Sequence, residues 1–486
     1  MPVDRDRDRD RDPDSRVPGS AARSPSPSRE SPLACPRAGP TPMNLPRIRR
    51  SRIDTEVVPP AGIDQSDDAQ IDADLPYTPG TARAALAHPR FRSVWAGTFA
   101  SNVGTWMQNV VLGVFAFQLT HSPTYVALLG FAQLGPLFLL SIVGGALADV
   151  VDRRRLLLAC QVEQLVFSLA LAWAASRAHP STGLVFVCVL AVGIGNALNA
   201  PAFTAVLPML VPRRDLPGAV SLQSVQMNLS RVIGPAVGGL LLPYVAAWGI
   251  FALNAATYGF AIVVIARVSL PPVDREAADP SDRGLRRLVG GLAVARTDPV
   301  VRYCLVTIFT VSFFCLPFIG LLPVVAARDL HIDPAGLRYG VLYALFGLGA
   351  ALGAISVGTV FAALPRTLLI RVGLLGFAAT LAVFGLVDAI GFAYPVVLVV
   401  GFAYFVTVTS LSTALQAHIA DQVRGRVMAL WIMGFGGTVP IGLLVGGALA
   451  SATSVRDVVL GGAAAALVIG TLAWLRAPSA DGPVAT

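Results

Sequence analysis

The recurrence of long apolar runs constrains this chain's fold more than any other sequence feature. A helix that crosses the hydrocarbon core of a bilayer needs about 20 mostly apolar residues. Runs of this length begin after Arg92 and are separated mostly by short connections. Their approximate limits are 94–118, 124–148, 156–176, 183–209, 218–242 and 247–267, then 303–326, 337–363, 368–387, 391–416, 428–450 and 457–475. The twelve runs predict an all-α membrane protein with twelve transmembrane helices.

The longest connection is hydrophilic and rich in arginine, and it divides the runs six and six. Its second part, Arg286 to Arg302, is predicted to form an amphipathic helix on the membrane surface. The N-terminal segment has Asp–Arg alternation and then Pro- and Ser-rich sequence, with too few apolar residues to form a core. We therefore predict a disordered cytoplasmic tail (1–90), a six-helix bundle (91–268), a cytoplasmic loop (269–302), a second six-helix bundle (303–476) and a cytoplasmic C-terminal tail (477–486).

The basic charge of the chain is explained by membrane topology. Charged residues make up only 14% of the sequence, the net charge is +8, and every basic residue is an arginine. If both termini lie inside, the outer connections hold only Arg177, Arg328, Arg338 and Arg456, and the inner connections hold many more arginines. This bias predicts a multi-pass protein of the cell membrane with both termini in the cytoplasm. A nucleic-acid partner is not needed to explain the charge.

Residue types that support enzymatic or metal chemistry are sparse. The five cysteines are scattered and form no CxxC or His/Cys cluster, so neither a disulfide framework nor a metal site is predicted. Without lysine the chain has no Walker nucleotide-binding sequence, which excludes ATP-driven transport by this chain alone. We expect a non-enzyme without a cofactor that works as a monomer in the lipid bilayer on a small-molecule substrate.

An internal repeat supports the six-and-six division. At an offset of 208 positions, the segment 234–239 (Gly-Pro-Ala-Val-Gly-Gly) falls on 442–447 (Gly-Leu-Leu-Val-Gly-Gly). At the same offset Gly193 falls on Gly401 and Leu222 on Leu430. Coincidences at matching places in matching helices indicate a duplicated six-helix unit.

The turn between the second and third runs carries an unusual concentration of charge. Its key residues are Gly145, Asp149, Asp152, Arg153 and Arg154. The simplest interpretation is a cytoplasmic loop whose charges are solvated and orient the helices. Asp149, however, directly follows small residues that allow another helix to approach closely. It could therefore form a latch between the two bundles that breaks when they move, and we predict this turn to be a conformational gate.

This turn resembles the signature of the major facilitator superfamily between its second and third helices. The match is Gly145-x-Leu147-Ala148-Asp149-x-x-Asp152-Arg153-Arg154. Asp152, where most members have glycine, is similar to the subgroup of siderophore and macrolide exporters that includes the enterobactin exporter. The segments Asn228-x-x-Arg231-Val232-Ile233-Gly234-Pro235 and Arg424-Gly425-Arg426-Val427-Met428 are also similar to that subgroup. The resemblance covers about residues 88–476 and implies proton-coupled export by alternating access.

The fifth run matches the core of a motif of export-type members of that superfamily. The matching residues are Gly234, Pro235, Gly238 and Gly239, although Ser230 stands where the longer motif has a glycine. Proline removes a backbone donor and the glycines allow close contact, which suits a helix that bends or slides. The alternative is a kinked packing helix with no meaning for the direction of transport.

Arg231 is the most informative single residue. It lies about 14 residues into its run, roughly 20 Å from the cytoplasmic end. Charged residues inside the membrane are expensive and are functional candidates by default. Glu163, on the third run, is the acidic side chain most clearly inside a run. The two residues are predicted coupling candidates; alternatively, Arg231 is paired structurally or attracts an anionic substrate.

Amide side chains inside the runs are candidates for lining a wet substrate cavity, with interior helix–helix hydrogen bonds as the alternative. The candidates are Asn102, Gln108, Asn109, Gln133, Asn199 and Gln226.

The function predicted from all these features is secondary active transport. With the resemblance, we expect export of an amphipathic small molecule (a siderophore, macrolide or other drug) driven by the proton gradient. The alternatives are an uptake carrier of the same fold and a transport-inactive membrane sensor or scaffold.

Overall fold

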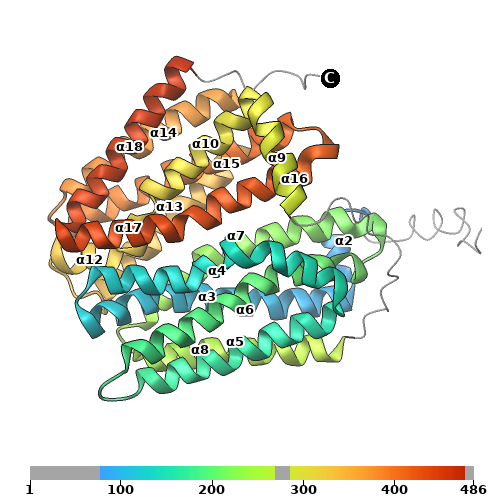
Figure 1. The fold of residues 1–486 in the computed structure, drawn as a ribbon, viewed down its shortest axis with the longest axis horizontal. Coiled ribbons are helices and arrows are strands. Elements are labelled where there is room, and N and C mark those ends of the chain that lie inside the picture. Colours follow the sequence, from blue (N-terminus) through green and yellow to red (C-terminus); the bar gives the residue numbers. More distant parts are fainter. Residues whose placement is uncertain (1–76, 269–284, 477–486) are drawn as a thin grey trace, which may run out of the picture. The chain divides into compact units, whose positions relative to one another are not determined.

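The first half of the chain folds into six long helices (Figure 1, blue to yellow-green). The computed structural model describes residues 77–268 and 285–476. The six helices are α3 (Pro89–Thr120), α4 (Pro123–Val150), α5 (Arg153–Ala175), α6 (Thr182–Val206), α7 (Leu216–Leu241) and α8 (Ala247–Arg267). Two short 3-10 turns, η1 (Leu207–Met209) and η2 (Arg213–Asp215), connect α6 to α7.

The second half forms six further spans, two of which are interrupted (Figure 1, yellow to red). The seventh predicted run is divided into α10 (Pro299–Phe314), α11 (Pro317–Gly320) and α12 (Leu322–Arg328). The eleventh is divided into α16 (Asp421–Ile432), a π-helical turn η5 (Met433–Gly437) and α17 (Thr438–Ala452). The other four are continuous: α13 (Leu337–Gly358), α14 (Arg366–Leu386), α15 (Ile390–His418) and α18 (Val455–Arg476).

Length and composition identify this architecture as a membrane protein. Within the described residues, eight stretches are long and apolar enough to cross a bilayer: those in α5, α6, α8, α10–α11, α13, α14, α15 and α18. Together with α3, α4, α7 and the interrupted α16–α17 span, they make up the twelve predicted spans. The predicted fold class, an all-α membrane protein of two six-helix bundles, is confirmed.

Helix packing follows the division into halves. In the first half, α3 packs on α7 and α8, and α6 packs on α4 and α5. In the second half, α15 packs on α13 and α14, and α18 packs on α14. The halves meet where α4 packs on α17 and where α7 packs on α13. We call the end of the bundles that carries the α4–α5 and α6–α7 connections the arginine-rich end.

The repeat offset is visible in matching side-chain contacts. Ser230 Oγ donates to the carbonyl of Gln226 at 2.8 Å, and Thr438 Oγ1 donates to the carbonyl of Gly434 at 2.7 Å. Serine and threonine 208 positions apart therefore bond back along their helices in the same way. Arg231 falls on Val439 at this offset, so the second half has no copy of this charge.

One short helix precedes the first span of each half. Helix α2 (Ala82–Ala87) ends directly before α3, and α9 (Leu285–Thr297) ends directly before α10. The predicted surface helix 286–302 therefore stops earlier, because Asp298 caps α10 and Pro299 begins it. The predicted disordered tail 1–90 includes α2 and the start of α3; its residues 1–76, like the predicted C-terminal tail 477–486, lie outside the described residues.

Candidate functional site

The charged turn between α4 and α5 connects the ends of three helices. Asp152 is the N-cap of α5, and its Oδ1 accepts from the Arg155 backbone N–H at 2.8 Å. Arg154 donates to the carbonyl of Ala266 in the last turn of α8, where a cation complements the helix dipole. An Arg153 guanidinium nitrogen lies 3.9 Å from the Met209 sulfur in η1. These contacts hold the turn against other ends of the same half.

Gly145 and Asp149 lie in the last two turns of α4. Their side-chain environment falls outside the described residues, so the predicted latch between the bundles stays a prediction. The described residues of the turn, Asp152 to Arg155, make local and same-half contacts.

Arg231 lies in the middle of α7 beside an aromatic ring of α3. Its guanidinium carbon is 5.5 Å from the centre of the Trp106 ring, within range of a cation–π interaction. A Cβ atom on Gly234 would meet the Trp106 Cβ, so the missing side chain makes room for this tryptophan. Pro235 lies inside α7 and cannot donate to the carbonyl four residues earlier, which belongs to Arg231. The predicted glycine–proline motif thus positions the charged residue and its aromatic partner.

Gly238 and Gly239 extend the same arrangement along α7. A Cβ on Gly238 would lie 2.9 Å from the carbonyl oxygen of Met107, on α3. Gly239 faces the other way, against Gly340 of α13. The three glycines of the motif therefore let α7 approach a helix of its own half and a helix of the other half closely.

The surroundings of Arg231 include a residue of the second half. Tyr404, on α15, lies near Arg231. Its ring packs on Phe377 with the ring centres 5.4 Å apart. Its hydroxyl is buried and has no hydrogen-bond partner among the described atoms. The site therefore combines a guanidinium, an indole ring and a phenol whose hydroxyl is available to bond.

Glu163 lies apart from this site in the contacts that are described. It is on α5, and a Cβ on Gly195 of α6 would collide with its Oε2. That oxygen is buried without a hydrogen-bond partner in the described structure. Glu163 lies near Tyr258 of α8. The two coupling candidates thus have different described neighbours.

Several predicted cavity residues are buried inside the first half. The Gln108 side chain is fully buried, and its Oε1 accepts from Asn254 on α8 at 2.8 Å and from Ser168 on α5 at 3.4 Å. Gln161 on α5 donates to Asn199 on α6 at 3.1 Å. These contacts are the helix–helix hydrogen bonds of the alternative interpretation. Asn254 and Ser168 were not singled out from the sequence, because nothing in the sequence pairs them with Gln108.

Gln226 and Gln133 are also almost fully buried. Gln226 accepts a 3.4 Å hydrogen bond from Thr98, whereas neither polar atom of the Gln133 side chain has a partner within the described structure. Asn102 and Asn109 on α3 are partly exposed, on the helix that carries Trp106. In this structure Gln108, Gln133 and Gln226 do not border solvent, and the Oδ1 of Asn109 is buried as well.

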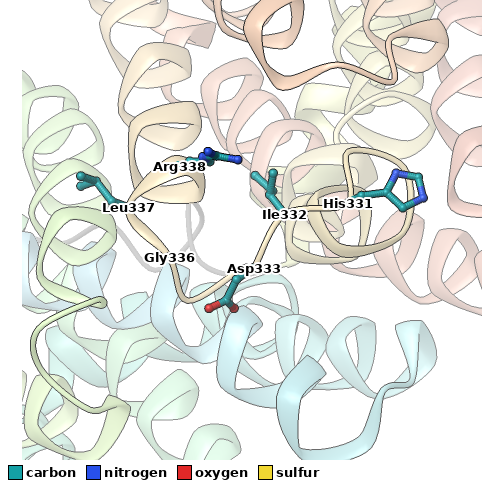
Figure 2. Close-up of a pocket in the computed structure, with 6 residues that line it drawn as sticks. All are labelled: His331, Ile332, Asp333, Gly336, Leu337 and Arg338. Atoms are coloured by element: carbon teal, nitrogen blue, oxygen red, sulfur yellow. The ribbon is translucent and has the colours of Figure 1, made fainter.

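A cavity of about 420 Å³ lies elsewhere, at the start of α13 (Figure 2). It is lined by His331, Ile332, Asp333, Gly336, Leu337 and Arg338. None of these residues was predicted to be functional, and all six lie in or next to the connection between α12 and α13. Its place in this connection separates it in the fold from the residues around Arg231.

In sequence the chain is similar to proteins named as exporters. The enterobactin exporter EntS of Escherichia coli O1:K1 is 28% identical over 355 residues, covering 71% of this chain and 81% of the relative. The enterobactin exporter EntS of Shigella boydii serotype 18 matches with the same identity and coverage.

Solved structures agree in fold. A bacterial homologue of the human lysosomal transporter Spinster, in an inward-facing and occupied conformation, matches with a TM-score of 0.64 at 15% identity, covering 82% of this chain and 98% of that one. The nucleoside transporter NupG matches with a TM-score of 0.62 at 12% identity, covering 80% of this chain and 98% of that one. These likenesses establish the fold of a transporter.

A family model supplies the assignment. The model described as transmembrane secretion effector matches residues 80–482, which includes every helix described above. The chain belongs to the transmembrane secretion effector family, and it is a transporter of the major facilitator type.

Proposed function

We propose that this protein exports an amphipathic small molecule, of the siderophore, macrolide or drug class, from the cytoplasm in exchange for protons. It works by alternating access in the plasma membrane, with the arginine-rich end and both termini in the cytoplasm. The relatives named as enterobactin exporters support the direction of transport and the siderophore class. The arginine bias supports the orientation.

The observation that carries this proposal is the surroundings of Arg231. A guanidinium inside a membrane-spanning helix, beside an indole ring and near a phenol of the other half, can recognise an anionic or aromatic group. The asymmetry of the repeat adds weight, because position 439 in the second half holds a valine. A purely structural charge would not need to stand between the halves. We assign Arg231 to substrate recognition.

Transport into everted membrane vesicles tests this proposal, with radiolabelled enterobactin as the first probe. Vesicles acidified inside should accumulate the probe, and a protonophore should abolish accumulation. Arg231→Ala should reduce accumulation at least tenfold, because about 1.4 kcal/mol of lost binding corresponds to a factor of ten. Arg177→Ala is the matched control, since Arg177 also stacks on a tryptophan, Trp173, but near the end of α5. Accumulation that survives the protonophore would refute proton coupling.

The two alternatives predict other results in the same system. An uptake carrier would accumulate the probe in right-side-out vesicles and not in everted ones. A transport-inactive sensor would show no accumulation in either, and would lose its cellular phenotype on deletion of residues 1–76 but keep it in Arg231→Ala.

A further inference from the structure

Two aspartate–histidine pairs lie at the arginine-rich end, one in each half. His88 Nε2 lies 2.8 Å from Oδ2 of Asp215, and His418 Nε2 lies 2.8 Å from Oδ2 of Asp298. The Asp215 side chain is only 2% exposed and that of His418 only 15%. Each pair joins residues more than a hundred positions apart, so it fastens separate elements together.

The two pairs occupy corresponding places in the repeat with their residue types exchanged. His88 is the N-cap of α3 and Asp298 is the N-cap of α10, the first span of each half. Proline follows each at the first helical position, and an arginine follows four residues after the cap, at Arg92 and Arg302. The partners, Asp215 and His418, both belong to the join between the fourth and fifth spans. One half therefore has His at the cap and Asp at the join, and the other half has the reverse.

Each pair also fixes a surface helix. Helices α2 and α9 end immediately before the capping residue and pack on the start of the fifth span of their half. A Cβ on Gly218 of α7 would collide with the backbone carbonyl of Thr81, and a Cβ on Gly291 of α9 would lie 2.6 Å from the backbone carbonyl of Arg426. In both halves a glycine brings the surface helix and the fifth span into backbone contact.

The second carboxylate oxygen of each aspartate accepts hydrogen bonds from backbone N–H groups close to the same pair. Asp215 Oδ1 accepts from the Gly80 backbone N–H at 3.0 Å, and Asp298 Oδ1 accepts from the N–H groups of Val300 and Val301 at 2.8 and 3.0 Å. Burial raises the pKa of the Asp215 carboxyl, but the hydrogen bonds from Gly80 and His88 lower this pKa by more than burial raises it. The pKa of Asp215 therefore lies below its usual range. The pKa of Asp298 is lowered against its burial by the Val301 N–H and His418. Carboxylates with a lowered pKa stabilise the fold at neutral pH and lose that contribution only in acid.

We propose that these pairs are two equivalent clasps, each fastening the surface helix and first span of its half to the join between the fourth and fifth spans, and that both tighten when the imidazole takes up a proton. Histidine is the side chain type whose charge changes most readily near neutral pH, whereas carboxylates with a lowered pKa stay charged there. A protonated imidazole turns each contact into a charge-assisted hydrogen bond, which is stronger than a neutral one. Cytoplasmic acidification would thus stiffen both halves at this end.

The other charged side chains described on the elements that meet at the clasps are arginines. The elements that meet at the first pair carry Arg83 on α2, Arg90 and Arg92 on α3, and Arg213 and Arg214 on η2. The elements that meet at the second carry Arg296 on α9, Arg302 on α10, and Arg424 and Arg426 on α16. Asp421 also begins α16, but its side chain lies outside the described residues. The paired carboxylate is the described acidic group in direct contact with each imidazole.

Thermal unfolding of the full-length protein in detergent, followed by tryptophan fluorescence at pH 6 and pH 8, tests the proposal without a substrate. A double-mutant cycle of His88→Ala and Asp215→Asn should give a coupling between the two residues that is larger at pH 6. The exchange variant His88→Asp with Asp215→His copies the arrangement of the other half and should recover most of the midpoint lost in either single variant. His179→Ala, in the α5–α6 connection, is the control and should change neither midpoint.

The outcomes separate a pH-sensitive clasp from a merely structural contact. Coupling of equal size at both pH values would refute the role of imidazole protonation. Failure of the exchange variant to recover the midpoint would refute the equivalence of the two clasps. If His88→Ala does not fold, the cycle on Asp298→Asn and His418→Ala decides the first question. These results do not depend on which molecule the protein transports.

Discussion

Gly239 of α7 and Gly340 of α13 lie backbone to backbone where the two halves cross. A Cβ atom on Gly239 would be 2.7 Å from the Gly340 Cα, a distance that real Cβ atoms do not show. The repeat partner of Gly239, Gly447, makes the other crossing, against Ala127 of α4. Beside it Thr124 Oγ1 bonds to Ser451 at 2.8 Å. Both crossings lie at the end of the bundles opposite the arginine-rich end. These contacts hold the two halves together at that opposite end.

Gly239→Val should separate the halves at that end, because the added side chain has no space unless α7 moves away from α13. Spin labels at Tyr244→Cys and Leu337→Cys, both exposed positions close to the crossing, should show a longer distance distribution by pulsed electron paramagnetic resonance. Gly259→Val in α8 is the matched control, because nothing lies within 4 Å of a Cβ there. An unchanged distance distribution would mean that this crossing does not hold the halves together.

Trp106→Ala should weaken export by about fivefold, because the ring beside Arg231 contributes about 1 kcal/mol through the cation–π interaction. Trp106→Phe should retain part of the activity, since a phenyl ring offers a weaker π face. The control is Trp173→Ala, which removes the ring under Arg177, 4.2 Å away. The measurement is the initial rate of enterobactin accumulation in everted vesicles. Equal losses in Trp106→Ala and Trp173→Ala would point to a general effect on folding instead.

The twelve spans, and the correspondence between the spans of the two halves, could be predicted because they depend on properties that a sequence displays directly. Burial in lipid requires long apolar runs, and a duplicated unit leaves matching glycines at one offset. Gly239 and Gly447 were aligned by that offset, and both lie at crossings between the halves. The special position of Arg231 also followed from the sequence, since a lone charge inside an apolar run stands out.

The interruptions and the partners of polar side chains could not be predicted. The π-helical turn at Met433–Gly437 contains three glycines, yet glycines elsewhere in these helices leave them regular. A Cβ on Gly434 would collide with the ring of Phe309, so this turn packs closely on α10. Gln108 was predicted to line the cavity because it is an amide inside an apolar run. Its position along α3 does not reveal that Asn254 and Ser168 of other helices face it. Such pairings depend on how helices rotate against one another.

Glu163→Gln should uncouple export from the proton gradient while the protein still inserts and folds. The glutamine keeps the size of the side chain but cannot take up or release a proton. The buried Oε2 without a described hydrogen-bond partner makes the charged form of Glu163 costly, so protonation and deprotonation should accompany a change of conformation. Counterflow of enterobactin, which needs no gradient, should persist in the variant, whereas accumulation driven by a gradient should fall to background. The exposed carboxylate of Asp333, replaced by Asn, is the control; a variant at Glu163 that still accumulates the probe would exclude this residue as the proton carrier.

Asp149→Asn should reduce transport without lowering thermal stability. Asp149 lies in the last turn of α4, where a negative charge opposes the helix dipole and costs about 0.3–1 kcal/mol. A residue that disfavours its own helix end must be compensated by a partner or serve a changing contact, and the predicted latch between the halves is such a contact. Asp333→Asn is the control, because Asp333 is exposed and lies outside this turn, in the connection between α12 and α13. Unfolding midpoints and export rates of the two variants are to be compared. An Asp149→Asn protein with unchanged transport would make this residue an ordinary part of the turn and leave Arg154, through its bond to the end of α8, as the residue that holds the turn in place.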